Sequence, residues 1–153
     1  MSARFSLVIP TLFLALWLGG CDTATQPLEG PIPPIPGGEA RLYFYRDANI
    51  YDGLLTTIVS LNGVPTGVSG LGTVFYRDVA PGTYRIEARS DKLYPAQVRT
   101  VVVAPGTSTY VRVQTLPYWG QSGWQWQGNT FIVNIVNPAM AEQEMIPLQL
   151  IRG

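Results

Sequence analysis

The sequence predicts an all-β domain, a single antiparallel β-sandwich or a partly open barrel, and three observations support this fold class. Apolar and polar residues alternate with a period of two through most of the chain after residue 38, as in half-buried antiparallel strands. Glycine and proline turn signals separate these segments at short intervals. No segment carries the 3.6-residue period of a long helix.

Seven segments carry the strand pattern. In the clearest of them, residues 83–89, Tyr84 and Ile86 alternate with the charged Arg85 and Glu87. β-branched and aromatic residues fill the segments, as a pleated surface favours. Short strands at this spacing are typical of transthyretin-like and immunoglobulin-like sandwiches. The other six predicted strands are 40–46, 56–61, 74–79, 96–103, 108–115 and 131–136.

Turn signals connect these strands. Asn62-Gly63 between apolar runs predicts a two-residue hairpin, and residues 67–72 predict a second turn. The pentapeptide Val-Ala-Pro-Gly-Thr occurs twice, at 79–83 and at 103–107. Proline followed by glycine suits the central positions of a type II turn, because proline fixes φ and glycine accepts a positive φ. We therefore expect the same hairpin turn twice, each copy ending one strand and starting the next.

One short helix is predicted near the C-terminus. Asn137 followed by Pro138 fits an N-cap with proline in the first turn, and the helix is expected to run to about Met145. Pro147 would end it, since proline cannot continue the helical hydrogen bonds. Residues 39–153 are enough for one hydrophobic core.

The N-terminus has the layout of a secretory signal. Arg4 supplies positive charge, an apolar run extends from Phe5 to Leu18, and two glycines lead into Cys21, the only cysteine. The run is shorter than the ~20 residues of a spanning helix. Small residues before a lone cysteine resemble the lipobox of bacterial lipoproteins, and this resemblance implies that Cys21 is acylated and begins the mature chain. An ordinary cleaved signal and an uncleaved anchor are the alternatives.

The sequence therefore divides into a signal peptide at 1–20, a tether at 21–38 and a domain at 39–153. The tether is rich in proline and glycine, and proline-rich chains extend by about 3.1 Å per residue. The lipobox resemblance implies a membrane anchor at Cys21, with the domain facing the periplasm of a bacterial cell envelope. Asp22 favours the inner over the outer membrane, by a rule that varies between bacterial groups.

Composition argues against catalysis and nucleic-acid binding. The chain has no histidine, the commonest general base near neutral pH, and a lipidated cysteine cannot act as a nucleophile. Ten basic and ten acidic residues balance, without a basic patch. Residues 47–53 superficially resemble a calcium loop, but Ile58 stands where a glutamate ligand belongs, so we expect a polar connection. We predict a non-enzymatic protein without a cofactor or a metal.

A family resemblance follows from five segments that occur in order along the domain: 43–46, 61–63, 72–76, 79–84 and 109–113. Their turn and strand motifs resemble the DUF2846 family, small domains often found on bacterial lipoproteins. The resemblance covers roughly residues 40–136. It implies a domain type and carries no activity with it.

The candidate binding site is an aromatic cluster within residues 117–130, a segment expected to be a loop. The cluster comprises Tyr118, Trp119, Trp124 and Trp126, among several glycines. One interpretation is a hairpin that folds over an end of the sandwich and buries its rings. The other is an exposed surface that docks an envelope protein partner, because tyrosine and tryptophan are enriched in interfaces. The alternative ligand is a glycan such as peptidoglycan, or another small molecule, stacked on the rings.

Overall fold

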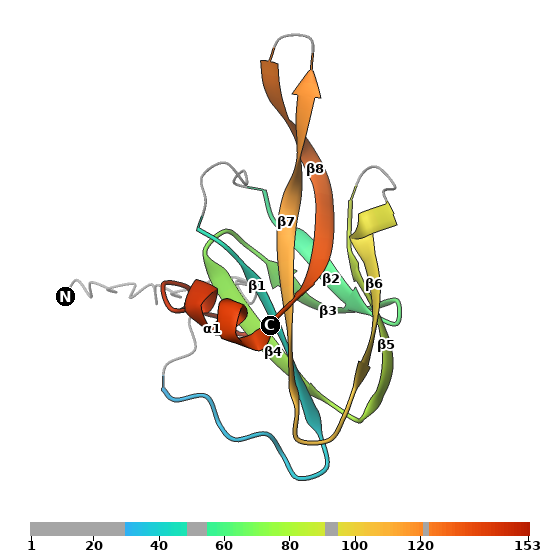
Figure 1. Ribbon diagram of the computed structural model, residues 1–153, viewed down its shortest axis with the longest axis vertical. Coiled ribbons are helices and arrows are strands. Elements are labelled where there is room, and N and C mark those ends of the chain that lie inside the picture. Colours follow the sequence, from blue (N-terminus) through green and yellow to red (C-terminus); the bar gives the residue numbers. More distant parts are fainter. Residues whose placement is uncertain (1–29, 49–54, 91–94, 121–122) are drawn as a thin grey trace, which may run out of the picture.

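The computed structural model describes residues 30–48, 55–90, 95–120 and 123–153, and it contains two β-sheets that pack face to face (Figure 1). The five-stranded sheet has the order β8-β7-β1-β4-β9, and the four-stranded sheet has the order β3-β2-β5-β6. The two sheets form an open sandwich and not a closed barrel, which confirms the predicted fold class. The strands are β1 Ala40–Arg46, β2 Thr57–Leu61, β3 Val64–Ser69, β4 Thr73–Val79, β5 Gly82–Ala88, β6 Val98–Val103, β7 Ser108–Gly120, β8 Gly123–Val136 and β9 Gln149–Leu150.

All seven predicted strands are present, and β1 has the predicted bounds. The structure adds two strands that the sequence did not predict, β3 and β9. The predicted turn at 67–72 is therefore shorter than expected, because β3 continues to Ser69. The Asn62-Gly63 hairpin is confirmed: Leu61 pairs with Val64, and the two turn residues have φ values of 51° and 82°.

Two strand pairs depart from the antiparallel pattern. β1 is antiparallel to β4 on one side and parallel to β7 on the other. β9 is parallel to β4 at the edge of the same sheet. β7 follows β6 of the other sheet, and β9 follows the helix at residues 138–145. Neither strand is therefore joined to its parallel neighbour by a hairpin.

The two pentapeptide copies have different structures, so the prediction of one hairpin used twice is wrong. At the second copy, the N–H of Thr107 donates to Ala104 O at 3.3 Å and Gly106 has φ 71°, as in a type II turn. At the first copy, Gly82 has φ 158° and is already the first residue of β5. Neither copy is a hairpin, since each carries the chain from one sheet to the other: β4 to β5, and β6 to β7.

The main core lies between the sheets. β1 is buried along nearly its whole length, because both faces of the five-stranded sheet are covered. Toward the four-stranded sheet it contributes Leu42 and Phe44, and the ring of Phe44 stacks on that of Phe75 at 5.0 Å. The remaining members come from both sheets and the C-terminal tail: Ala40, Val59, Leu61, Ile86, Ala88, Val103, Val111, Val113, Phe131, Val133 and Ile151.

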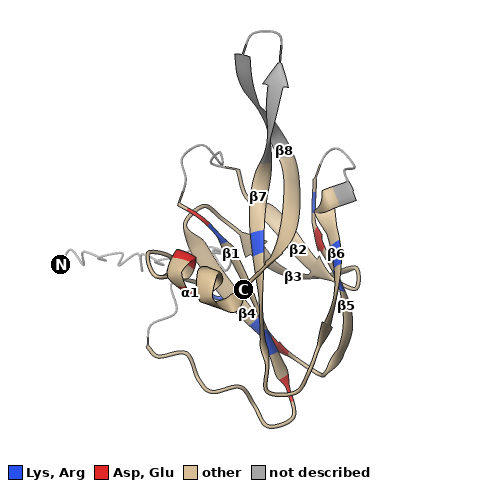
Figure 2. Cartoon of the chain, in the orientation of Figure 1, with Lys and Arg blue, Asp and Glu red and all other residues tan. Residues whose placement is uncertain are grey.

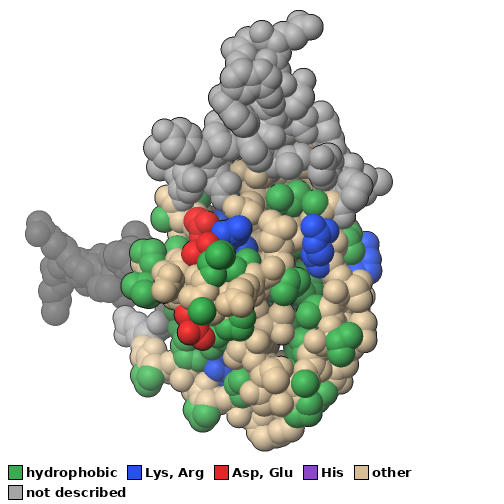
Figure 3. Space-filling model, viewed as in Figure 1, with side chains coloured by type: hydrophobic (Ala, Val, Ile, Leu, Met, Phe, Trp, Pro, Cys, Tyr) green, Lys and Arg blue, Asp and Glu red, His purple; other side chains and the backbone are tan. Residues whose placement is uncertain are grey.

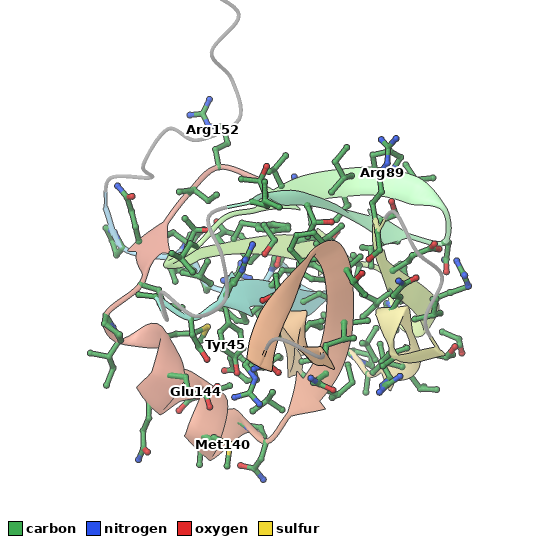
Figure 4. All side chains as sticks on the ribbon, turned by 90° about the horizontal axis from the view of Figure 1, so that it is seen from above. Tyr45, Arg89, Met140, Glu144 and Arg152 are labelled. Carbon is green, nitrogen blue, oxygen red and sulfur yellow. The ribbon has the colours of Figure 1, made fainter. Side chains whose placement is uncertain are left out.

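The helix α1, Pro138–Met145, covers the outer face of the five-stranded sheet (Figures 1 and 4). Its bounds are those predicted, and Asn137 Oδ1 accepts a hydrogen bond from the N–H of Ala139 at 3.0 Å, as an N-cap does. Beneath the helix a second cluster contains Tyr45, Val74, Tyr110 and Ala141. Among the described residues, no helix has the length and apolar character needed to cross a membrane.

Candidate functional site

The predicted aromatic loop is a β-ribbon that outgrows the five-stranded sheet. β1 pairs with β7 only as far as Arg112, whereas β7 and β8 remain paired to Gly120 and Gly123. We call the part from the Thr115–Phe131 pair onward the hairpin extension, and Figure 1 shows β7 and β8 rising beyond the two sheets. The expectation of a loop at 117–130 is therefore wrong, since β-strands fill this segment on both sides of residues 121–122.

The strand register brings the predicted site residues together along the backbone. Trp119 of β7 is the pairing partner of Trp124 of β8, and Trp126 is the partner of Pro117. Tyr118 lies between Pro117 and Trp119 on β7, and a register shift separates Thr115 from Pro117. The side chains of this segment lie outside the described residues, as do Cys21 and the middle of the calcium-like segment.

A row of three tyrosines on the outer face of the five-stranded sheet is a feature that the sequence analysis missed. Tyr43 in the central strand pairs with Tyr76 on one side and with Tyr110 on the other. The rings of Tyr43 and Tyr110 are stacked, with centroids 5.1 Å apart and planes within 6°. The rings of Tyr43 and Tyr76 are tilted, with centroids 6.0 Å apart. We call these three residues the tyrosine row.

An ion pair lies next to the tyrosine row on the same face. Arg41 pairs across β1 and β4 with Asp78, two register positions from the Tyr43–Tyr76 pair. Its Nε donates to Asp78 Oδ1 at 2.6 Å and its Nη2 donates to Oδ2 at 2.8 Å, a two-pronged contact. The Arg41 guanidinium carbon lies 4.2 Å from the centre of the Tyr76 ring. Arg41 is only 2% exposed, so its charge is held by Asp78 and by the aromatic ring.

Carboxylates of α1 dock the helix on the other end of the tyrosine row. Glu144 accepts from the hydroxyl of Tyr45 at 2.5 Å and from Arg112 Nη1 at 2.7 Å. Glu142 accepts from the hydroxyl of Tyr110 at 2.9 Å. Figure 4 shows Glu144 directed from the helix toward Tyr45, and Figure 3 shows acidic and basic side chains beside each other near α1. Polar contacts therefore hold the helix in place over apolar and aromatic side chains of the five-stranded sheet.

Comparison with known proteins decides the family. Residues 36–123 match the family model whose description is "Protein of unknown function (DUF2846)". The chain belongs to the DUF2846 family. No curated protein and no solved structure matches the chain. The matched residues of this DUF2846 protein extend from before β1 to the start of β8, so they include the tyrosine row, Arg41 and Asp78.

The tyrosine pKa values of the DUF2846 domain respond to the docked helix. Burial, reinforced by the hydrogen bond to Glu142, raises the pKa of Tyr110 to about 12. Burial and the bond to Glu144 also raise the pKa of Tyr45 well above its ordinary value. Both phenols are therefore donors in the folded state, and ionising either one would place a phenolate beside a carboxylate.

Raising the pH above about 10 is expected to destabilise this DUF2846 domain, because tyrosine ionises near pH 10 in the unfolded chain and later in the folded one. The stabilisation is complete below pH 10 and is lost as the pH rises toward the folded pKa of Tyr110, about 12. Thermal unfolding followed from pH 8 to pH 12 measures this loss. Tyr110→Phe lacks the ionising hydroxyl and should lose less stability over the same range; an identical pH profile would contradict the assignment.

A groove of about 250 Å³ lies on the outer face of the four-stranded sheet of the DUF2846 domain. Glu87 on its wall already pairs with Arg85, and Ser90 Oγ accepts from the N–H of Phe131 at 2.8 Å. Two polar groups of the groove therefore already have partners within the domain. Its lining residues are Ile58, Ser60, Gly63, Pro65, Glu87, Arg89, Ser90 and Gln97.

Charged side chains of the DUF2846 domain do not gather into a cluster of like charge within the described ranges. Acidic and basic residues are scattered along the strands (Figure 2). The described ranges contain no group of three or more histidine, cysteine, aspartate or glutamate side chains that could hold a metal ion.

Proposed function

We propose that this DUF2846 protein is a bacterial envelope lipoprotein, anchored through a lipidated Cys21, whose non-catalytic sandwich domain binds a protein partner through the hairpin extension. The main support for the binding role is the hairpin extension. Beyond the Thr115–Phe131 pair, the described strands β7 and β8 pair only with each other.

The physical argument for a partner concerns the stability of such a ribbon. A two-stranded hairpin alone is at best marginally stable in water, because it buries little apolar surface. This one contains the Trp119–Trp124 pair and Trp126, the most interface-prone residue type. A partner that packs on the ribbon or adds a strand to it would supply the apolar contacts that a two-stranded hairpin lacks. The sandwich supplies a rigid base for it, since Val113 and Val133 at the root of the hairpin are fully buried.

The argument for a lipid anchor comes from the N-terminal sequence. The run from Phe5 to Leu18 followed by Gly-Gly-Cys has the order of a lipoprotein signal, and Cys21 is the only thiol of the chain. An unpaired cysteine in an oxidising compartment is reactive unless its sulfur is consumed, and a thioether to lipid consumes it. Several acyl chains give stable attachment where one does not.

Cys21→Ser is expected to abolish lipid labelling, because serine offers no sulfur for the thioether. The measurement is incorporation of labelled palmitate in the bacterial host, together with the apparent mass of the processed chain. Ser60→Ala, a change on the outer face of the four-stranded sheet, serves as the control and should label like the wild type. Equal labelling of Cys21→Ser and wild type would contradict the lipoprotein assignment.

Replacing Trp124 and Trp126 together with alanine is expected to remove the crosslinked partner while the domain stays folded. In-cell crosslinking followed by mass spectrometry measures the partner, and thermal unfolding measures the fold. If the rings were buried in the domain, each change would instead cost about 3–5 kcal/mol and the domain would unfold. The control is Gln125→Ala with Gln127→Ala on the same strand, which leaves every ring in place.

The same double variant separates the protein partner from a glycan. Retained crosslinks combined with lost sedimentation on purified peptidoglycan would assign the hairpin extension to a glycan and overturn protein docking. Retained crosslinks and retained sedimentation in a folded variant would remove both roles from the tryptophans. Cys21→Ser and the tryptophan pair test different halves of the proposal, so each can fail alone.

A further inference from the structure

Part of the predicted tether is bound to the sandwich. The segment from residue 30 to residue 38, blue in Figure 1, runs past the lower end of the five-stranded sheet before the chain enters β1. Arg41 Nη1 donates to the carbonyl of Pro33 at 2.6 Å, and Nη2 reaches the carbonyl of Pro34 at 3.5 Å. The N–H of Glu39 donates to Pro36 O at 3.1 Å and closes the turn into β1.

Backbone carbonyl oxygens make this contact, as they do when proteins recognise extended proline-rich chains, and Pro33 and Pro34 themselves stay exposed. Such a chain has no internal hydrogen bonds, and its carbonyl oxygens are free to accept. Aromatic-lined surfaces with fixed donors bind it at low entropic cost, because the chain is already stiff. Arg41 is such a donor: Asp78 holds two of its N–H groups, and the remaining groups reach two successive proline carbonyls.

Aromatic rings border this donor. The guanidinium lies over the Tyr76 ring at 4.2 Å and is 6.0 Å from the centre of the Tyr43 ring. Both rings remain partly exposed, whereas Tyr110 at the far end of the row is buried. The surface thus combines a charged fork, neutralised by Asp78, with two partly exposed tyrosine rings. The Tyr76 ring lies under the guanidinium, and the Tyr43 ring stacks on Tyr110.

We propose that Arg41, Asp78, Tyr43 and Tyr76 form a recognition site for an extended proline-rich peptide, and that the chain's own Pro33-Pro34 segment occupies this site in cis. The resident sequence from residue 31 to residue 36 is Pro-Ile-Pro-Pro-Ile-Pro. A proline-rich segment of another molecule has the chemistry to replace it. This site lies on the outer face of the sandwich and is independent of the hairpin extension.

The test uses the full chain with Pro33→Gly and Pro34→Gly, which frees the backbone of the resident segment. A fluorescent peptide with the sequence of residues 27–38 is titrated against it, and anisotropy reports binding. We expect saturable binding to this variant and at least about tenfold weaker binding to the wild type, where the resident segment competes at millimolar effective concentration. No binding to the variant, or equal binding to both chains, would overturn the proposal.

Arg41→Gln in the glycine variant tests the donor. It should abolish peptide binding, whereas Arg85→Gln, which removes an exposed arginine of the other sheet, should leave binding unchanged. Circular dichroism checks that each variant is folded. If Arg41→Gln does not fold, Tyr76→Leu at its partly exposed position replaces it, and binding that survives loss of the Tyr76 ring contradicts the site.

Discussion

Gly67→Ala is expected to lower the free energy of unfolding by about 1–3 kcal/mol, the usual cost of overpacking a core. A Cβ atom at this position would lie 2.4 Å from Cε2 and 2.6 Å from Cζ of Phe75. The ring cannot move away freely, because it is fully buried and stacks on Phe44. Urea denaturation measures the effect as a lower midpoint with an unchanged slope.

Gly70→Ala is the matched control for this substitution. Gly70 lies one residue beyond the same strand, and a Cβ there would be 3.6 Å from Thr73 Oγ1, an ordinary contact. The free energy of unfolding of the Gly70→Ala variant is expected to stay within about 0.5 kcal/mol of the wild-type value. Equal urea midpoints for the two variants would mean that the backbone at Gly67 does not pack closely against the Phe75 ring.

Glu144→Ala is expected to cost about 1–3 kcal/mol and to release α1 from the sheet. The change removes the acceptor of the Tyr45 hydroxyl, and Tyr45 is fully buried. It also removes the partner of Arg112 Nη1. A buried donor without an acceptor retains its full desolvation cost, so the loss exceeds the net value of one hydrogen bond. Chemical denaturation measures the stability, and limited proteolysis near Met145 measures the release.

Gln143→Ala provides the comparison for Glu144→Ala. Gln143 is exposed on the same helix, so removing its side chain leaves the docking contacts intact. Alanine is also a good helix former, and this variant should match or slightly exceed the wild type. Equal protease resistance of the two variants would show that Glu144 does not hold the helix in place.

Local sequence signals predicted most of the fold. Alternation identified the central strands, and Asn137-Pro138 located α1 within its observed bounds. β3 escaped prediction because it is an irregular edge strand: it contains Pro65 and Gly67, and its register shifts opposite Val59 and Ser60. β9 has two residues and gains its identity only from pairing with β4.

The proposed recognition surfaces were less predictable, because they depend on which strands become neighbours. Tyr43 and Tyr110 meet only because β1 and β7 are neighbours in a register that places them opposite each other, and no local pattern records that pairing. The two identical pentapeptides make the same point, since Gly106 adopts a type II turn and Gly82 begins a strand. The tryptophans were found from composition alone, although their place on a ribbon depended on the long pairing of β7 with β8.

The buried position of Ile151 constrains the order of events during synthesis. Ile151 is 1% exposed, belongs to the main core and donates its N–H to Val74 O at 2.8 Å. A nascent chain that has emerged only as far as α1 lacks this side chain and the β9 pairing. The apolar side chains that Ile151 covers then remain exposed to water on one flank of the sandwich. Completing this flank of the main core therefore needs the residues around Ile151.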